Sequence, residues 1–334
     1  ETFDLACVDL NSYLAMDMEC LAFLARAAGD EEKAAGYQEE WERLRDRMNE
    51  GLWNEERGLY LDRKWSGAWS ERVAASNFLP LIAGVPSPDQ AGRMMETLTD
   101  PAWFWGEYLL PTISRNDPAF GDQQYWRGTI WPPMNYLVYQ GIKRYGFDEI
   151  AGTMARRSVA LFLRSWRDYQ LCRENYDSRS GEGGGQRYQS WGPLFALILL
   201  EEFIDYCPFG GFRVGNLAAE KETRLENIRL RDRLYRIIAD KKSLYLWRDG
   251  RQVIGYRGRG VIRGLEIGER VIAGNLHVVS DTLTLDPRIF KNSPYRAEIG
   301  GKETTTPGPG PLTLEKGWHQ IRLSAGEIPK EEDP

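Results

Sequence analysis

The period of the apolar residues changes once along the chain, and this change constrains the fold more than any other feature. Up to about residue 206 the apolar positions recur at helical spacing, as in residues 8–28, where leucines, methionine and alanines repeat every three or four positions. After Gly210-Gly211 short runs alternate between apolar and polar residues, and Arg248-Asp249-Gly250 is a strong hairpin signal. The sequence therefore predicts two domains, a helical one over residues 1–208 and a small antiparallel β-sandwich over residues 209–334.

Helices are expected at about seven places in the first domain. They are 8–28, 31–51, 73–84, 88–98, 132–145, 148–166 and 191–206. Asp30 is suited to cap the second of them, and Pro132 to begin the fifth as a first-turn proline. The helices follow one another in pairs, joined by alternating short turns and long aromatic loops. This order is typical of a mainly α toroid of helical hairpins whose long loops gather at one mouth.

Composition and charge exclude several functions. The 334 residues are 42% hydrophobic and 28% charged, as in a globular protein with a sizeable core. The net charge of −6 is spread along the chain, and no basic block could neutralise phosphates, which argues against a nucleic-acid partner. The longest apolar run, Leu194–Leu200, is far shorter than the ~20 residues of a membrane span, so no membrane partner is expected either.

Cysteine and histidine usage narrows the chemistry further. The cysteines are scattered without a CxxC pair, which is compatible with free thiols in a reducing cytoplasm, the expected location. His277 and His319 are the only histidines, and neither has metal-ligand spacing to a second His or to a Cys. A zinc enzyme and a Ser-His-Asp triad are therefore poorly supported, and no metal or cofactor is expected.

Two aromatic, hydrogen-bonding segments are the strongest candidates for a functional site. The first, Tyr125–Tyr136, reads YWRGTIWPPMNY; the second, Arg173–Tyr188, contains RENYD and the glycine-rich GEGGGQRY. Pyranose rings present C–H faces that stack on indole rings, and Arg donates several fixed hydrogen bonds to neighbouring hydroxyls. The pattern predicts a carbohydrate-binding site lined by Tyr125, Trp126, Arg127, Gly128, Trp131, Asn135, Tyr176, Gln186 and Trp191.

Plainer interpretations remain open for parts of this site. Trp131, directly before two prolines, could simply pack at the start of a helix. Asn135 could hydrogen-bond to the backbone of its own helix instead of to a ligand. The glycine-rich run is not a phosphate loop, because no Lys-Ser/Thr ends it and no strand is expected before it.

Glu174 is the candidate catalytic residue. Hydrolysis of a glycosidic bond takes two carboxyl groups, of which one protonates the leaving oxygen and the other activates water or attacks the sugar. Glu174 lies between the end of a predicted helix and a flexible loop, where it can project into a mouth with Arg173 and Asn175 beside it. The glycines of the loop would let backbone approach a ligand closely. The alternative is a surface glutamate in a polar loop.

These motifs resemble glycoside hydrolase family 63, and they are also similar to the related trehalases of family 37. The resemblance covers about residues 1–208. It rests on four motifs in the order found in the family: Val8–Leu14, the Trp53–Asp62 hairpin, Tyr125–Trp131, and Glu174–Asp177 with its glycine-rich run and Gln189-Ser190-Trp191.

The resemblance implies an (α/α)6 toroid that hydrolyses an α-glucosidic bond with inversion. Glu174 falls on the water-activating general base, and Trp126, Arg127 and Trp131 fall on the motif that lines the sugar pocket. The general acid of the family is an Asp upstream of the Asp-Leu-Asn motif, which is Asp9–Asn11 here. That acid, and about half of the toroid's helices, are therefore expected before residue 1. A half-toroid would expose apolar helix faces, so we expect a homodimer or association with a missing N-terminal portion.

Three functions compete at this point. The first is an inverting α-glucosidase-like hydrolase acting on an α-glucoside, such as a disaccharide, a short oligosaccharide or a glycosylglycerate. The second is a non-catalytic carbohydrate-binding or assembly subunit that kept the aromatic mouth. A third, an (α/α)6 phosphorylase or epimerase, is disfavoured by the scarcity of histidine and the lack of a phosphate-binding cluster. The C-terminal domain is expected to cover helices rather than to bind sugar.

Overall fold

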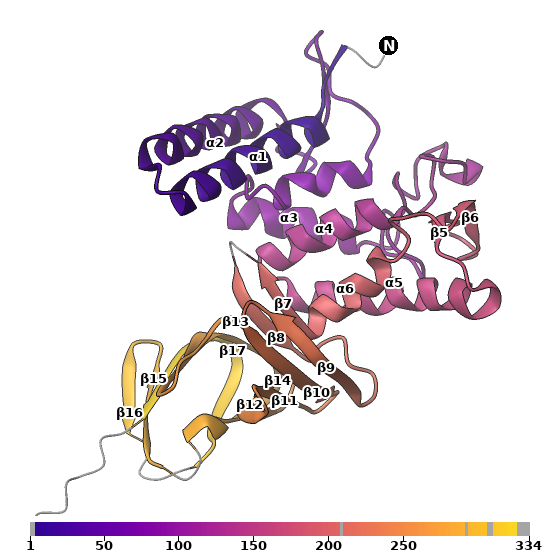
Figure 1. Cartoon of the computed structure of the whole chain (residues 1–334). Coiled ribbons are helices and arrows are strands. Elements are labelled where there is room, and N and C mark those ends of the chain that lie inside the picture. Colours follow the sequence, from indigo (N-terminus) through magenta and orange to yellow (C-terminus); the bar gives the residue numbers. More distant parts are fainter. Residues whose placement is uncertain (1–3, 208–209, 291–292, 306–309, 326–334) are drawn as a thin grey trace, which may run out of the picture. The chain divides into compact units, whose positions relative to one another are not determined.

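Figure 1 shows a computed structural model of the chain, which describes residues 4–207, 210–290, 293–305 and 310–325. The residue contacts divide the chain into two compact units, Glu1–Ile198 and Leu199–Pro334. The assignment of a catalytic domain to residues 1–208 and of an accessory domain to residues 209–334 stays a prediction.

The α-helices of the first unit begin and end close to the predicted positions. They are α1 Val8–Ala27, α2 Glu31–Gly51, α3 Pro88–Thr99, α4 Pro132–Arg144, α5 Asp148–Tyr169 and the start of α6 Leu194–Phe203. Asp30 caps α2 as predicted, because its side chain accepts a hydrogen bond from the Lys33 N–H. Ser87 and Gln90 form a capping box at α3. Pro132 begins α4, also as predicted.

Short antiparallel strand pairs connect these helices. They are β1 Leu5–Ala6 with β4 Arg63–Lys64, β2 Trp53–Asn54 with β3 Leu59–Tyr60, and β5 Arg173–Tyr176 with β6 Gly183–Arg187. The β2–β3 pair confirms the predicted hairpin, whereas β5 and β6 replace an expected loop. A second difference concerns residues 73–84, where the 3-10 helix η2 Ala75–Leu81 stands in place of an α-helix. It contains Pro80, which lacks the N–H of a regular helical turn.

Close packing of helix on helix fixes the interior of the first unit. Helices α1 and α2 lie side by side (Figure 1). Helix α4 packs on η2, and Gly141 permits the contact because a Cβ there would lie 2.6 Å from the Leu81 Cβ. The short 3-10 helix η3, Phe120–Asp122, precedes the YWRG motif. Among the described helices, none combines the length and apolar character that a membrane span requires.

The second unit is built on one antiparallel sheet, which has 11 strands among the described residues. The strands are β7 Ile204–Cys207, β8 Gly211–Gly215, β9 Thr223–Leu230, β10 Arg233–Asp240, β11 Ser243–Arg248, β12 Arg251–Arg257, β13 Gly260–Ile267, β14 Val271–Asp286, β15 Tyr295–Ile299, β16 Lys302–Thr305 and β17 Leu312–Ala325. One face of the sheet carries the apolar core, which includes Ile262, Ile272, Leu276 and Leu323, all buried. The 3-10 helix η4, Arg288–Phe290, follows β14.

The prediction of a mainly α fold, an (α/α)6 toroid followed by a small β-sandwich, is wrong. Strands make up most of the second unit, and they join one sheet instead of two packed layers. The cause lies in β14, which continues through a register irregularity between Val278 and Thr282 where the sequence pattern indicated three short strands. Its first half pairs with β13 and its second half with β12, while β17 follows it along both halves. One long strand therefore joins, in a single sheet, the stretch for which the pattern indicated three separate strands.

Candidate active site

Backbone pairing brings the two aromatic segments together. Ile130 donates its N–H to the Tyr176 carbonyl at 2.8 Å, and the Tyr176 N–H donates back to the Ile130 carbonyl at 3.0 Å. Tyr176 ends β5, and Ile130 directly precedes Trp131 at the start of α4. The YWRGTIW segment is therefore fixed next to the strand that carries Glu174.

The aromatic rings of both segments form a two-layered stack. Trp126 lies flat on Trp131, with ring centroids 4.5 Å apart and planes 10° apart. The ring centroid of Trp191 lies 6.0 Å from that of Trp131. Tyr125 meets Trp131 edge-on, with ring centroids 5.1 Å apart. Trp131 is only 3% exposed, whereas Trp126 is 43% and Tyr125 is 65% exposed. An outer layer that a sugar ring could reach thus rests on an inner ring that solvent does not reach.

Hydrogen bonds hold the inner ring in place. The Trp131 indole N–H donates to the Thr129 hydroxyl at 2.9 Å and to the Tyr125 carbonyl at 3.1 Å. Since a buried Trp N–H needs a partner, these bonds satisfy the ring without a ligand. Trp131 is placed to support Trp126 from behind.

Glu174 has one oxygen that is held and one that is open. Its Oε2 accepts a hydrogen bond from the Gln186 backbone N–H at 2.7 Å, and its backbone carbonyl accepts one from the Trp191 indole at 3.0 Å. Within the described part of the chain, its Oε1 accepts no hydrogen bond. A carboxylate anchored through one oxygen can present the other to water in a defined direction.

Gly185 is required for this anchoring. It has a φ of +66°, and a Cβ at this position would lie well inside van der Waals contact of the Glu174 Oε2. Only glycine adopts this conformation without strain and leaves the space that the carboxylate occupies.

The turn between β5 and β6 is held by Asp177. Its Oδ1 accepts hydrogen bonds from the N–H groups of Arg179 at 2.7 Å and Ser180 at 2.9 Å. Burial acts to raise the pKa of the Asp177 carboxyl, but these backbone donors together with the charged Arg179 guanidinium outweigh burial and lower the pKa below its ordinary value. The carboxylate therefore stays charged at neutral pH, and the turn that presents Gln186 to Glu174 stays closed.

Besides Trp131, two further residues predicted to bind substrate lie in the interior. Asn135 is fully buried, and its side chain exchanges hydrogen bonds with Leu110, accepting from the N–H at 2.8 Å and donating to the carbonyl at 3.2 Å. Tyr176 is fully buried and stacks on Phe195 at 5.6 Å, and burial raises the pKa of its hydroxyl. The structure does not bring either side chain to the stacked rings' exposed surface.

Of the remaining predicted residues, Arg127 and Gln186 are exposed and Gly128 is buried. The Arg127 guanidinium is more than half exposed and pairs with Asp122 at 3.0 Å. Gly128 has a φ of +101°, and a Cβ there would meet the Gln123 side chain at 2.5 Å. Gln186 contributes its backbone N–H to Glu174, and its side chain is exposed.

Gln123 and Tyr188 were not among the residues predicted to line the site. The Gln123 Oε1 accepts a hydrogen bond from the Ser178 N–H at 2.8 Å and so ties the YWRG segment to the β5–β6 turn. Tyr188 is strongly exposed and stands just after β6. The pair of glutamines directly before Tyr125 was an available signal for the first residue; nothing in the sequence distinguishes Tyr188 from other loop tyrosines.

The exposed Trp126 indole and the Glu174 carboxylate are groups that a carbohydrate site uses, and known proteins point to the class of glycoside hydrolases. Residues 1–192 match the family model described as "Mannosylglycerate hydrolase MGH1-like glycoside hydrolase domain". The chain belongs to this family. The predicted resemblance to family 63 is thereby confirmed.

Similar proteins of known name support the assignment. A mannosylglycerate hydrolase of Thermus thermophilus is 34% identical over 155 residues, and one of Rubrobacter radiotolerans is 31% identical over 204 residues. These matches cover 45% and 58% of this chain but only 35% and 43% of the relatives. The chain therefore spans well under half the length of these relatives.

Solved structures agree at the level of the fold. The family 63 mannosylglycerate hydrolase of Thermus thermophilus in complex with glucose matches 59% of this chain and 48% of its own, with a TM-score of 0.52 and 28% identity. A protein titled sialidase matches 75% of this chain and 26% of its own, with a TM-score of 0.64 and 18% identity, which shows a shared fold alone. The neutral trehalase of Saccharomyces cerevisiae matches 59% of this chain and 38% of its own, with a TM-score of 0.50 and 21% identity, again a likeness of fold alone.

Over the described ranges, no three His, Cys, Asp or Glu residues gather closely enough to hold a metal ion.

We predict that Gly185→Ala destabilises the chain more than Gly29→Ala does. Gly29 has a φ of +81° with no atom near its missing Cβ, so its substitution carries only the backbone strain of about 1–2 kcal/mol. Gly185→Ala adds the clash with Glu174. Urea unfolding measures the two losses, and hydrogen exchange at the Gln186 amide reports on the anchoring bond. Equal losses with an unchanged Gln186 amide would contradict the proposed role of Gly185.

Proposed function

We propose that this chain provides the sugar platform and the water-activating carboxylate of a glycoside hydrolase that acts with inversion. The observation that carries the proposal is the state of Glu174, whose Oε2 is fixed by Gln186 at 2.7 Å while its Oε1 is open. An inverting enzyme needs a base that can orient one water molecule against the sugar. Trp126 offers an exposed ring close by, on which that sugar could stack.

The proposed substrate is an α-linked hexoside. The relatives from Thermus thermophilus and Rubrobacter radiotolerans are named for mannosylglycerate, so a hexose joined to glycerate is the first compound to try. An α-glucoside or a short oligosaccharide is the wider class that we inferred from the motifs. The stack and the Arg127 guanidinium suit any of these, since they contact ring faces and hydroxyls that the compounds share.

We propose further that the general acid comes from residues outside this chain. The relatives are more than twice as long as their matched parts, and inverting hydrolysis takes a second carboxyl group across the sugar from the base. Without such an acid the leaving group departs unprotonated, which typically slows the reaction by ~10²–10⁴-fold.

We predict that Glu174→Gln lowers kcat by ~10²-fold or more and leaves KM nearly unchanged, because it removes the base but keeps the shape of the site. The assay compares mannosylglycerate, glucosylglycerate and aryl α-glucosides, using this chain alone and extended by the gene sequence before Glu1. Glu182→Gln is the matched control, an exposed glutamate in the same turn, and should stay within about twofold of the parent.

The hydrolase proposal fails if the extended protein turns over none of these compounds, or if Glu174→Gln keeps the parental rate. Sugar binding without turnover by the extended protein would instead favour the competing function, a carbohydrate-binding or assembly subunit.

We infer that the exposed side of α1 packs against further helices of the same domain. Leu10, Leu14, Leu21 and Leu24 recur at helical spacing, and Leu10 is 69% exposed. A row of leucines on one helix face is more apolar than a surface helix normally shows to water. The much longer chains of the relatives supply a source for the covering helices, and we favour that occupant over a second copy of this chain.

We predict that the double substitution Leu14→Glu and Leu24→Glu lowers the free energy of unfolding of the extended protein by several kcal/mol, since burying a leucine stabilises a protein by about 1.5–3 kcal/mol. In the present chain both positions are exposed, so the same substitutions should change its free energy of unfolding by less than about 0.5 kcal/mol per site. Urea unfolding of both proteins measures this, with light scattering to record their mass. Equal losses, or a dimer of this chain that the substitutions dissociate, would contradict the inference.

We place the protein in the cytoplasm. All four cysteines are free thiols, a state that a reducing compartment preserves. Burial raises the pKa of the Cys7 and Cys172 thiols, which keeps them in the unreactive protonated form. A disulfide found in protein purified from cells without added reductant would argue against this location.

A further inference from the structure

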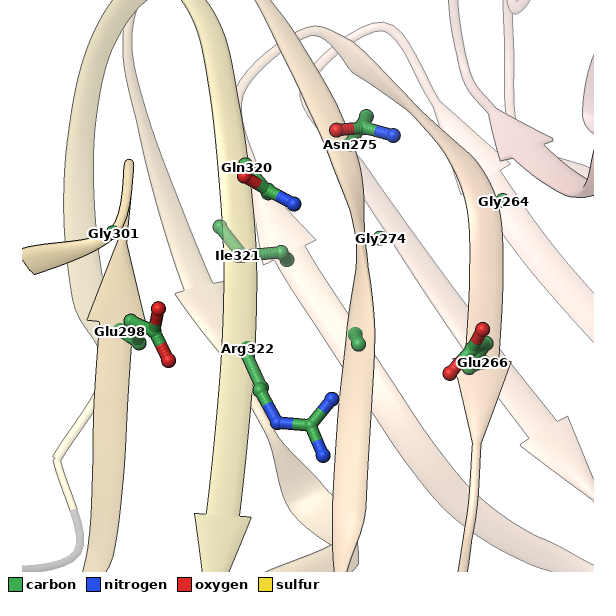
Figure 2. A pocket seen from close by; sticks show the side chains of 10 residues that line it. Gly264, Glu266, Gly274, Asn275, Glu298, Gly301, Gln320, Ile321 and Arg322 are labelled. Carbon is green, nitrogen blue, oxygen red and sulfur yellow. The ribbon is translucent and has the colours of Figure 1, made fainter.

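A group of polar side chains crosses four strands on the outward face of the sheet in the second unit (Figure 2). We call it the polar row, and its members are Glu266, Asn275, Glu298, Gln320 and Arg322. All five side chains are exposed. Glu298 on β15 lies opposite Arg322 on β17, and Gln320 lies opposite Asn275 on β14. Side chains paired in this way have Cβ atoms about 4.5–5.5 Å apart, so the row is continuous.

The polar row lines a hollow, and its side chains are not engaged with one another. The hollow has a volume of ≈ 250 Å³ and also borders Gly264 and Gly301, which have no side chains to fill it. Among the described residues, none of the five side chains makes a hydrogen bond or an ion pair with another. This holds even for Arg322 and Glu298, which have opposite charges and lie opposite each other on neighbouring strands. Their donors and acceptors are therefore available to a ligand.

A rigid aromatic ring continues the row. Trp318 stands two residues before Gln320 on β17, and its side chain is 51% exposed. Its ring stacks on His277 with centroids 4.4 Å apart and planes 9° apart, and the Arg263 guanidinium lies 5.6 Å from the ring centroid. These contacts fix the orientation of the indole and leave half of its surface to solvent.

The combination selects a class of ligand. Sugar rings present apolar C–H faces to an indole and adjacent hydroxyls to carboxylates, amides and guanidinium groups, which bind two hydroxyls at once. The row holds two carboxylates and one guanidinium, so its net charge is negative and does not attract a polyanion such as nucleic acid. From Trp318 to Arg322 the strand rises about 13 Å, enough for a short oligosaccharide.

We propose that the polar row and Trp318 form a docking site for a neutral oligosaccharide, separate from the site around Glu174. The proposal departs from the expectation that the C-terminal domain covers helices rather than binds sugar. The proposal does not depend on the proposed hydrolysis, because it concerns residues of the second unit alone.

The test measures binding by calorimetry to three neutral oligosaccharides, maltoheptaose, mannohexaose and cellohexaose, and to heparin as a polyanion. The full chain carries Trp126→Ala throughout, which removes the exposed ring of the candidate active site. Trp318→Ala and Arg322→Ala are each introduced into this background. Trp65→Ala is the matched control, since it deletes a tryptophan that is 79% exposed in the first unit.

We expect at least one neutral oligosaccharide to bind, with an affinity that falls at least tenfold in both Trp318→Ala and Arg322→Ala and does not change in Trp65→Ala. Because both side chains are exposed, circular dichroism should show an unaltered fold. The proposal is overturned if no neutral oligosaccharide binds, if either substitution in the row leaves the affinity intact, or if heparin binds through the same residues. Loss of hydrolysis by Glu174→Gln would leave the docking result untouched, so the two proposals fail separately.

Discussion

Two backbone hydrogen bonds between Ile130 and Tyr176 hold the candidate active site together. They join segments from the start of α4 and the end of β5, at 2.8 and 3.0 Å, deep enough that Tyr176 is fully buried. Buried backbone groups are costly to leave unpaired, so this contact resists separation. Through it, the stacked indoles and Glu174 keep a constant relation. Much of what we infer about function depends on that relation.

The two segments that the structure brings together at the candidate site could be predicted from the sequence because their local motifs are strong. Glycines close to Glu174 in the sequence, and tryptophans close to Arg127, indicated a sugar site before any geometry was known. Which rings face solvent could not be predicted. Trp131 and Asn135 belong to the same motif as Trp126, yet hydrogen bonds to Thr129 and Leu110 retain them in the interior. Thr129 stands two residues before Trp131 within the motif itself. Leu110, in contrast, lies 25 residues from Asn135 and is brought to it by the tertiary fold, which a local pattern does not encode.

The helices could be predicted from period and caps, and the fold class could not. Asp30 and Pro132 act within a single turn, so their effect is visible in the sequence. The sheet of the second unit depends on β14, which bends between Val278 and Thr282 and exchanges one partner strand for another. A short polar interruption in an alternating pattern predicts a loop equally well. The choice between loop and bulge is made by strands distant in the chain.

The central claim is that Glu174 activates water opposite the leaving group. The stereochemistry of the first product tests it most directly, because a base that delivers water inverts the anomeric centre and a nucleophile retains it. Proton NMR during hydrolysis of an α-glycoside by the extended protein would show which anomer forms before mutarotation. The account predicts the β-anomer first. Initial release of the α-anomer would contradict it.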